Sequence, residues 1–153
     1  AASAWRLQAS LNHSMRLTSE LKIRDGVPII NQLGADSGQR RHRLSGQLGL
    51  SRTGLGLTLQ GQWSSGGQLR LGDGQQNLYF RPPLLFNFSG FVDADKFSEH
   101  AIFKGLKISV DVHNVTRQYR RVVRADGSVP AGYGRDDVDP MGRNVKITLR
   151  KRF

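Results

Sequence analysis

The sequence predicts an all-β protein whose strands form one antiparallel sheet, part of a transmembrane β-barrel. Three observations predict it. Apolar and polar residues alternate with a period of two in six segments, and this period gives a strand one apolar and one polar face. The segments reach about ten residues, the length of a tilted strand that crosses an outer membrane. Long and short connections alternate between the segments, as they do in outer-membrane barrels.

The first three expected strands cover residues 5–23, 41–50 and 55–63. In the first, apolar residues from Trp5 to Ile23 fall on odd positions and polar residues fall between them. The second ends at the turn sequence Ser-Arg-Thr-Gly of residues 51–54, and the third begins directly after it. In the third, leucines alternate with glycine, threonine and glutamine. Small and polar residues on one face suit a water-filled lumen better than a packed core.

The last three expected strands cover residues 77–91, 106–112 and 143–153. Pro82 and Pro83 interrupt the fourth and predict a bulge or a shortened strand there, because proline cannot donate to the hydrogen-bond ladder. The sixth places Val145, Ile147 and Leu149 on one face and ends on the aromatic residue Phe153. A soluble domain rarely ends on such a strand, since an exposed edge strand promotes aggregation.

The connections predict which end of the sheet faces outward. Residues 25–39, 64–76 and 117–142 are polar and long, 51–54 form a minimal turn, and 93–105 have room for a helical turn. If the last strand ends in the periplasm, counting backward puts the three long connections outside the cell and the tight turn inside. The lengths of the connections thus agree with their order along the chain, and this agreement favours the wall of a barrel over a β-sandwich.

Composition leaves two classes of protein open. The chain has 153 residues, with 23 Lys and Arg against 12 Asp and Glu and a net charge of +11, which first suggests nucleic-acid binding. The basic residues are spread over alternate strand positions, however, and a basic lumen or loops facing lipopolysaccharide would give the same charge. The alternative to a barrel is thus a soluble basic β-protein that binds nucleic acid.

Other features exclude some kinds of chemistry. Cysteine is absent, so disulfides and thiolate metal sites are excluded. No stretch of 18 apolar residues predicts a membrane helix, and the first residues lack the pattern of a signal peptide. The four histidines have no paired ligand spacing, and an ordinary solvated loop explains Asp136, Asp137 and Asp139 better than a calcium site. We expect no catalytic residues, no metal and no cofactor.

The last third of the chain resembles the end of TonB-dependent outer-membrane receptors. The resemblance rests on Gly-Leu-Lys-Ile-Ser-Val-Asp-Val-His-Asn-Val at residues 105–115, on Asp126-Gly127, on Asp-Pro-Met-Gly-Arg at residues 139–143, and on the terminal Phe153. Residues 63–66, Trp-Ser-Ser-Gly, and the strand–turn–strand around Gly54 are similar too. Lys151 departs from the family pattern, because that position usually carries an apolar residue facing lipid.

The resemblance implies a receptor barrel in the outer membrane of a Gram-negative bacterium. Residues 1–153 would be the C-terminal part of its barrel domain, with about six of roughly 22 strands. The plug domain and the segment that contacts TonB would lie in an amino-terminal portion that is missing here or on another chain. Implied partners are that portion, TonB through it, outer-membrane lipid and lipopolysaccharide, and an unknown scarce ligand that is imported with TonB-coupled energy. No nucleic acid is expected as a partner.

The two faces then give the expected site residues. The residues expected to face the lumen and the ligand are Arg43, Gln60, Gln62, Lys107, Asp111 and His113. The residues expected to face lipid are Leu55, Leu57, Leu59, Val110, Ile147 and Leu149. The resemblance further implies that a C-terminal signal for barrel assembly is formed by Gly142, Val145, Ile147, Leu149 and Phe153.

Overall fold

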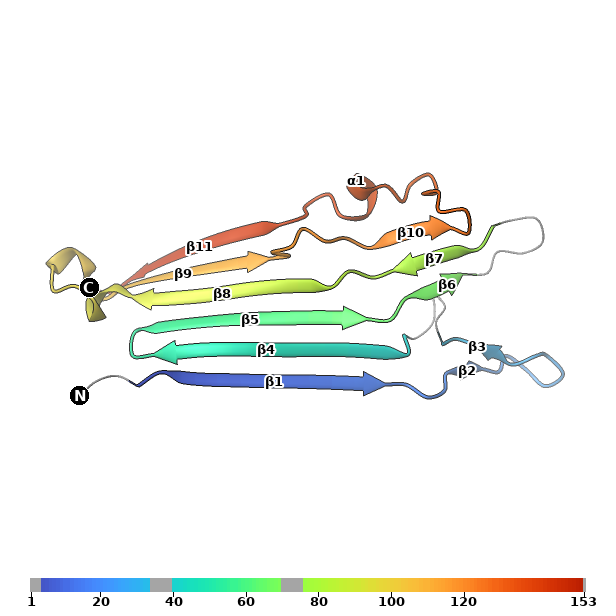
Figure 1. Cartoon of the computed structure of the whole chain (residues 1–153), viewed down its shortest axis with the longest axis horizontal. Coiled ribbons are helices and arrows are strands. Elements are labelled where there is room, and N and C mark those ends of the chain that lie inside the picture. Colours follow the sequence, from blue (N-terminus) through green and yellow to red (C-terminus); the bar gives the residue numbers. More distant parts are fainter. Residues whose placement is uncertain (1–3, 34–39, 70–75, 153) are drawn as a thin grey trace.

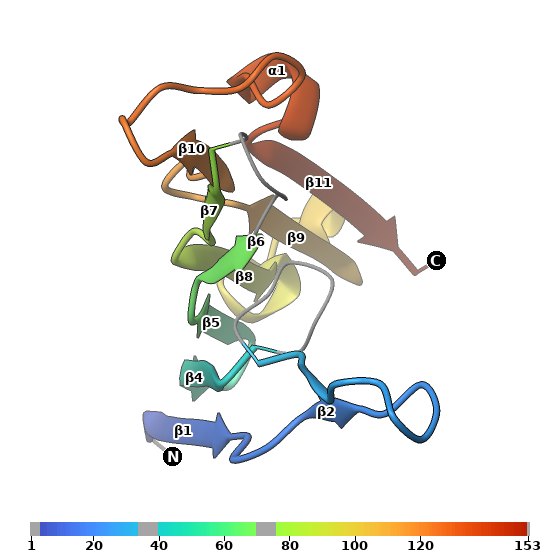
Figure 2. The same cartoon turned by 90° about the vertical axis from the view of Figure 1, so that its right-hand side faces the viewer.

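The computed structural model describes residues 4–33, 40–69 and 76–152. Six long strands form one antiparallel sheet in the order β1-β4-β5-β8-β9-β11 (Figure 1). They are β1 (Arg6–Met15), β4 (His42–Arg52), β5 (Leu55–Ser64), β8 (Leu85–Asp93), β9 (Leu106–His113) and β11 (Asn144–Lys151). Seen end-on they form a single layer, with β1 and β11 at opposite edges (Figure 2). The prediction of an all-β antiparallel protein is confirmed, and the six long strands form an open sheet.

The first strand is shorter than predicted. The alternation continues to Ile23, but β1 ends at Met15, which lies opposite the first residue of β4, His42. One more backbone bond, from the Arg16 N–H to the Arg41 carbonyl, continues the pairing, and beyond it the chain has no neighbouring strand in the main sheet. The following short strands, β2 (Glu20–Leu21) and β3 (Ile30–Asn31), pair only with each other. The ladder therefore ends where its partner ends, although the sequence pattern continues.

Pro82 and Pro83 divide the fourth predicted strand, as expected for residues that cannot donate to a ladder. The part before them, β7 (Leu78–Arg81), leaves the main sheet and pairs with β6 (Gly67–Leu69) and β10 (Arg121–Arg124). The two connections that were predicted as polar loops thus contribute β6 and β10 to a second, three-stranded sheet, and the predicted fourth strand contributes β7. A short helix, α1 (Arg135–Val138), follows β10.

The core of the described residues lies in this second sheet. Leu78, Phe80 and Val122 are the buried hydrophobic residues, and the Tyr133 ring packs edge-on against Phe80 at 6.3 Å between ring centroids. The main sheet has no comparable core: the side chains of Leu7 and Ile147 are 71% and 66% exposed. Within the described residues nothing covers either of its faces.

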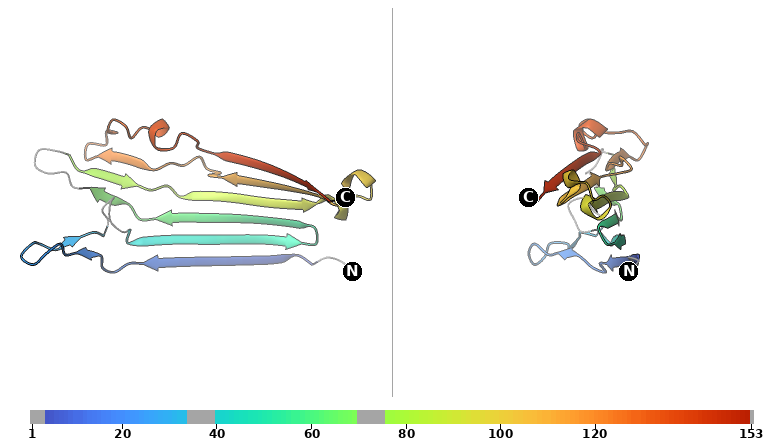
Figure 3. Two further views of the ribbon diagram at one scale, coloured as in Figure 1. Left: turned by 180° about the vertical axis from the view of Figure 1, so that it is seen from behind. Right: turned by 90° about the vertical axis from the view of Figure 1, so that its left-hand side faces the viewer.

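The two ends of the main sheet differ in character (Figure 3). One end carries the second sheet, the β2–β3 hairpin and α1. The other carries the β4–β5 turn, where Gly54 has a φ of +79° that favours glycine, and two short 3-10 turns, η1 (Ala94–Lys96) and η2 (Ala101–Phe103). The backbone N–H of Asp93 donates to the Gly54 carbonyl at 2.7 Å, which fixes η1 against the turn. The three long connections therefore lie at one end, and the tight β4–β5 turn and the intermediate connection of residues 94–105 lie at the other.

The pairing register aligns the alternation across all six strands. Leu50 lies opposite Leu57, Leu57 opposite Gly90, and Val110 opposite Ile147. What we call the apolar face carries Leu7, Leu11, Met15, Leu44, Leu48, Leu50, Leu55, Leu57, Leu59, Trp63, Phe86, Phe88, Val92, Leu106, Ile108, Val110, Val112, Val145, Ile147 and Leu149. The same register puts His13, His42, Arg52 and Lys151 on this face, at or near the ends of their strands. The opposite, polar face carries Gln8, Ser10, Asn12, Arg43, Gln47, Thr58, Gln60, Gln62, Asn87, Ser89, Lys107, Asp111, His113, Lys146 and Arg150.

Candidate functional site

The register puts the two sets of predicted site residues on opposite faces. The set expected at the lumen, namely Arg43, Gln60, Gln62, Lys107, Asp111 and His113, lies on the polar face. The set expected at lipid, namely Leu55, Leu57, Leu59, Val110, Ile147 and Leu149, lies on the apolar face.

The six polar residues are spread over the face and do not form one pocket. Arg43 and Gln62 line a cavity of about 420 Å³ at the end of the long connections. Lys107 lines a second cavity of about 290 Å³ at the end of the short connections. Gln60 lies midway between them and donates to the side-chain carbonyl of Gln47 at 3.4 Å. A ligand at either end would therefore contact only part of the predicted set.

Lys107 belongs to a small cluster at the short-connection end. Its ammonium lies 3.7 Å from the Asp93 carboxylate and 3.7 Å from the centroid of the Phe91 ring. Phe91 is an aromatic residue on the polar face, and it lies directly opposite Gly56. A Cβ atom on Gly56 would come within 2.3 Å of the Phe91 ring, so the ring occupies the space that glycine leaves free.

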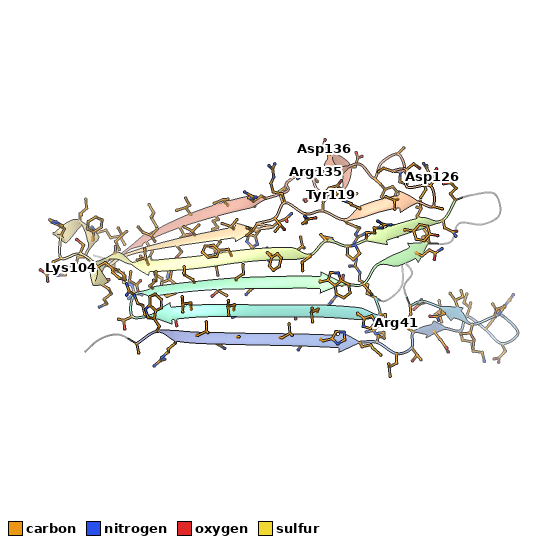
Figure 4. All side chains as sticks on the ribbon, in the orientation of Figure 1. Arg41, Lys104, Tyr119, Asp126, Arg135 and Asp136 are labelled. Atoms are coloured by element: carbon orange, nitrogen blue, oxygen red, sulfur yellow. The ribbon has the colours of Figure 1, made fainter. Side chains whose placement is uncertain are left out.

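Four arginines gather at the other end of the sheet, where β1 ends and β4 begins. Arg16, Arg40, Arg41 and Arg43 line a cavity of about 740 Å³ together with Ser14, Met15, Leu17 and Thr18. We call these four residues the arginine corner; Figure 4 shows Arg41 at the start of β4. Only Arg43 was predicted as a site residue. The basic run at residues 40–43 was a visible signal, but the sequence did not show that Arg16 lies beside it.

Asn114 stabilises the end of the β9–β11 hairpin at which the long connection begins. It follows β9 with a φ of +53°, a conformation that asparagine tolerates better than most residues. Its backbone N–H donates to the Asn87 side chain at 3.0 Å, and its own amide donates to the Gln118 carbonyl at 2.6 Å. The Asp139 carboxylate lies 3.5 Å from the same amide and accepts from the Gly142 N–H at 3.1 Å. Asn114, Asp139 and Gly142 belong to the segments that resemble the receptor family. Their hydrogen bonds stabilise the place where the long connection leaves β9 and returns to β11.

The long connection also carries two arginine side chains that pack on the ring of one tyrosine. The guanidinium groups of Arg121 and Arg135 lie 5.6 Å and 5.4 Å from the centroid of the Tyr119 ring. Figure 4 shows Tyr119 together with Arg135 and Asp136 of α1. Cation–π contacts at exposed sites contribute about 0.5–1 kcal/mol each, so this group helps to order the loop.

The residues of the expected assembly signal lie at one edge of the sheet. Val145 and Leu149 are on the apolar face of β11, and Gly142 precedes the strand with a φ of +58°. Phe153 lies outside the described residues. Lys151, the residue that departs from the family pattern, is also on the apolar side by register, but its ammonium donates to the Ile102 carbonyl at 2.9 Å. Its charge thus reaches the end of the sheet, as a snorkelling lysine does.

In residues 4–33, 40–69 and 76–152 no three His, Cys, Asp or Glu side chains stand where they could share a metal ion. Over the same ranges no helix is long and apolar enough to span a membrane. Comparisons with protein-family models, with curated proteins and with solved structures give no match.

A turn in the long connection gives a pH-dependent prediction. The Ser128 side chain, and then its backbone N–H at 2.9 Å from Asp126 Oδ1, lower the pKa of the Asp126 carboxyl below its ordinary value of 3.8. The folded turn favours the charged form of the carboxyl. The contribution of the Asp126 carboxylate to the stability of the turn is therefore present above pH 3.8, and it is lost as the pH falls through the lowered pKa. We expect the Ser128 amide NMR signal to titrate in this range.

The matched control for this titration is Asp126→Asn. Asparagine keeps an oxygen acceptor for the Ser128 N–H but cannot ionise. The Ser128 signal of this variant should be unchanged across the same pH range. A titration that persists in Asp126→Asn would assign the effect to another group.

Proposed function

We propose that this chain forms a wall segment of an outer-membrane receptor barrel of the TonB-dependent type, which binds a scarce ligand outside the cell and imports it. One observation carries the proposal: the register aligns a continuous apolar face and a continuous polar face over six antiparallel strands. Lipid would cover the apolar face, and the polar face would line the lumen. An uncovered apolar surface of this size is unfavourable in water.

The strand lengths and the two ends of the sheet support this reading. A tilted strand crosses a membrane with about 9–11 residues, and the six long strands have 8 to 11 residues. In the proposed orientation the second sheet and α1 stand outside the cell, and the β4–β5 turn lies in the periplasm. Outer-membrane barrels have long external loops and short periplasmic turns.

The open edges of the sheet imply β-partners. Unpaired backbone groups cost several kcal/mol each in lipid, so the free sides of β1 and β11 need neighbouring strands. The smallest packed barrels use about eight strands and plugged transporters about 22. The other barrel strands of the receptor would supply these neighbours, and the plug portion would carry the contact with TonB.

A nitroxide scan of β5 tests the proposal. Single cysteines at Leu57, Thr58, Leu59 and Gln60, each spin-labelled in the receptor in its outer membrane, should alternate in accessibility. Positions 57 and 59 should be relaxed by oxygen, which concentrates in lipid, and positions 58 and 60 by a water-soluble nickel chelate. A soluble nucleic-acid-binding protein would give no oxygen maximum at 57 and 59, and that result would refute the proposal.

Impermeant labelling of intact cells tests the orientation. Cysteines at Ser128, in the turn after β10, and at Thr53, in the β4–β5 turn, should differ: Ser128→Cys should react and Thr53→Cys should react only after the outer membrane is opened. Ser37, which also falls in an expected external loop, lies outside the described residues. Labelling of Thr53→Cys on intact cells with protection of Ser128→Cys would reverse the topology.

A further inference from the structure

We infer that the arginine corner binds a small, water-soluble ligand that carries two or more carboxylate or phosphate groups. This inference rests on the proposed function and narrows the class of the imported ligand. Arg16, Arg40, Arg41 and Arg43 stand at the outer end of the polar face, where a ligand entering the lumen would first meet the β1 and β4 strands.

The backbone forces the charges together. Met15 pairs with His42, and the Arg16 N–H donates to the Arg41 carbonyl at 2.8 Å, which continues the ladder by one step. Arg16 and Arg41 therefore face each other across the strand pair, and Arg43 stands one pleat away opposite Ser14. Like charges directly opposite one another destabilise a sheet, so the guanidinium groups of the corner repel one another.

The described surroundings do not neutralise these charges. The residues that line the two cavities at this end include no aspartate and no glutamate. Within the described residues the ion pairs are Lys22–Asp25 and Lys107–Asp93, both away from the corner. A bound anion would supply the missing negative charge. Guanidinium groups suit this role because their fork of N–H donors matches both carboxylate and phosphate oxygens.

The site has the size and the polar partners of a small-ligand pocket. The cavities of about 740 Å³ and 420 Å³ share Arg40 and Arg43, and ligand pockets typically measure about 300–1,000 Å³. Arg40 donates to the Ser64 hydroxyl, which holds its guanidinium over β5. Ser45, Gln62 and Ser64 offer further hydrogen bonds from the polar face. Since Arg43 and these partners share the polar face, the corner suits a soluble anion better than a lipid headgroup.

The test is calorimetric titration of the purified receptor in neutral detergent with two probes, inorganic pyrophosphate and propane-1,2,3-tricarboxylate. We expect at least one to bind, with an affinity that falls as salt is raised. Arg40→Gln/Arg43→Gln should weaken binding about tenfold or more, since a hydrogen bond to a charged group contributes about one such factor. Arg40→Lys/Arg43→Lys should retain part of the affinity, because lysine keeps the charge but loses the fork.

The matched control is Arg6→Gln/Arg150→Gln, which removes the same charge from the opposite end of the same face. Its affinity should stay within about twofold of the parent. Equal losses in both double variants, or no binding of either probe, would overturn the inference. So would binding confined to nanodiscs containing lipid A, because the ligand would then be a lipid phosphate. The nitroxide scan does not depend on the ligand, so its alternation would leave the proposed function standing even if the corner bound nothing.

Discussion

Ile147→Arg is expected to destabilise the folded barrel by about 2–4 kcal/mol, the cost of an arginine near the middle of the bilayer on a lipid-facing position. Ile147 is central in β11, it lies opposite Val110 on the apolar face, and its side chain is 66% exposed. The free energy of unfolding in lipid vesicles, measured by urea titration of the whole barrel, gives the value directly.

The neighbouring residue provides the control. Thr148 follows Ile147 in the same strand and lies on the polar face opposite Ser109. Thr148→Arg should change the free energy of unfolding by less than about 1 kcal/mol, because the added charge would face water. If both substitutions cost the same, or if Thr148→Arg costs more, the assignment of the two faces to lipid and lumen would be reversed or lost.

Gly56→Ala is expected to destabilise the protein by about 1–3 kcal/mol, the usual cost of forcing an extra group into filled space. A Cβ atom there would lie 2.3 Å from Cε1 and 2.9 Å from Cζ of Phe91. The ring has little freedom to move away, because the Lys107 ammonium stands 3.7 Å from its centroid. Alanine also reduces the conformational entropy of the unfolded chain, which offsets about 0.5–1 kcal/mol of the steric cost. Because the steric cost is the larger of the two, the net effect of the substitution is destabilising.

A double-mutant cycle separates this contact from general damage to the strand. Phe91→Ala removes the ring, so Gly56→Ala should then cost little or stabilise the strand. Gly49→Ala is the matched control: Gly49 lies on the same face of the adjacent strand β4, and a Cβ atom there would meet nothing closer than 3.8 Å. It should be neutral or slightly stabilising. A cost for Gly56→Ala that stays unchanged in the Phe91→Ala background would disprove the contact.

The sequence alone determined the strands and their faces, because these depend on local features. The period of two in residues 55–63 and 106–112 corresponds closely to β5 and β9, and the two prolines correctly mark the break between β7 and β8. The glycine-containing turn at residue 54 is equally local. Since alternate side chains of any strand point to opposite sides, the division of the site residues within each strand followed from its pattern, whereas the alignment of these sides across strands depends on the register.

The tertiary structure decided what depends on pairing between distant segments. Met15 ends β1 because β4 begins opposite it, and no feature between Met15 and Ile23 signals that end. β6, β7 and β10 form a second sheet only because the β5–β8 connection, which holds β6 and β7, meets the β9–β11 connection, which holds β10. The arginine corner and the Phe91–Gly56 contact likewise join residues from different strands. A period of two specifies which way a side chain points, but which residue it meets is fixed only by the register between strands.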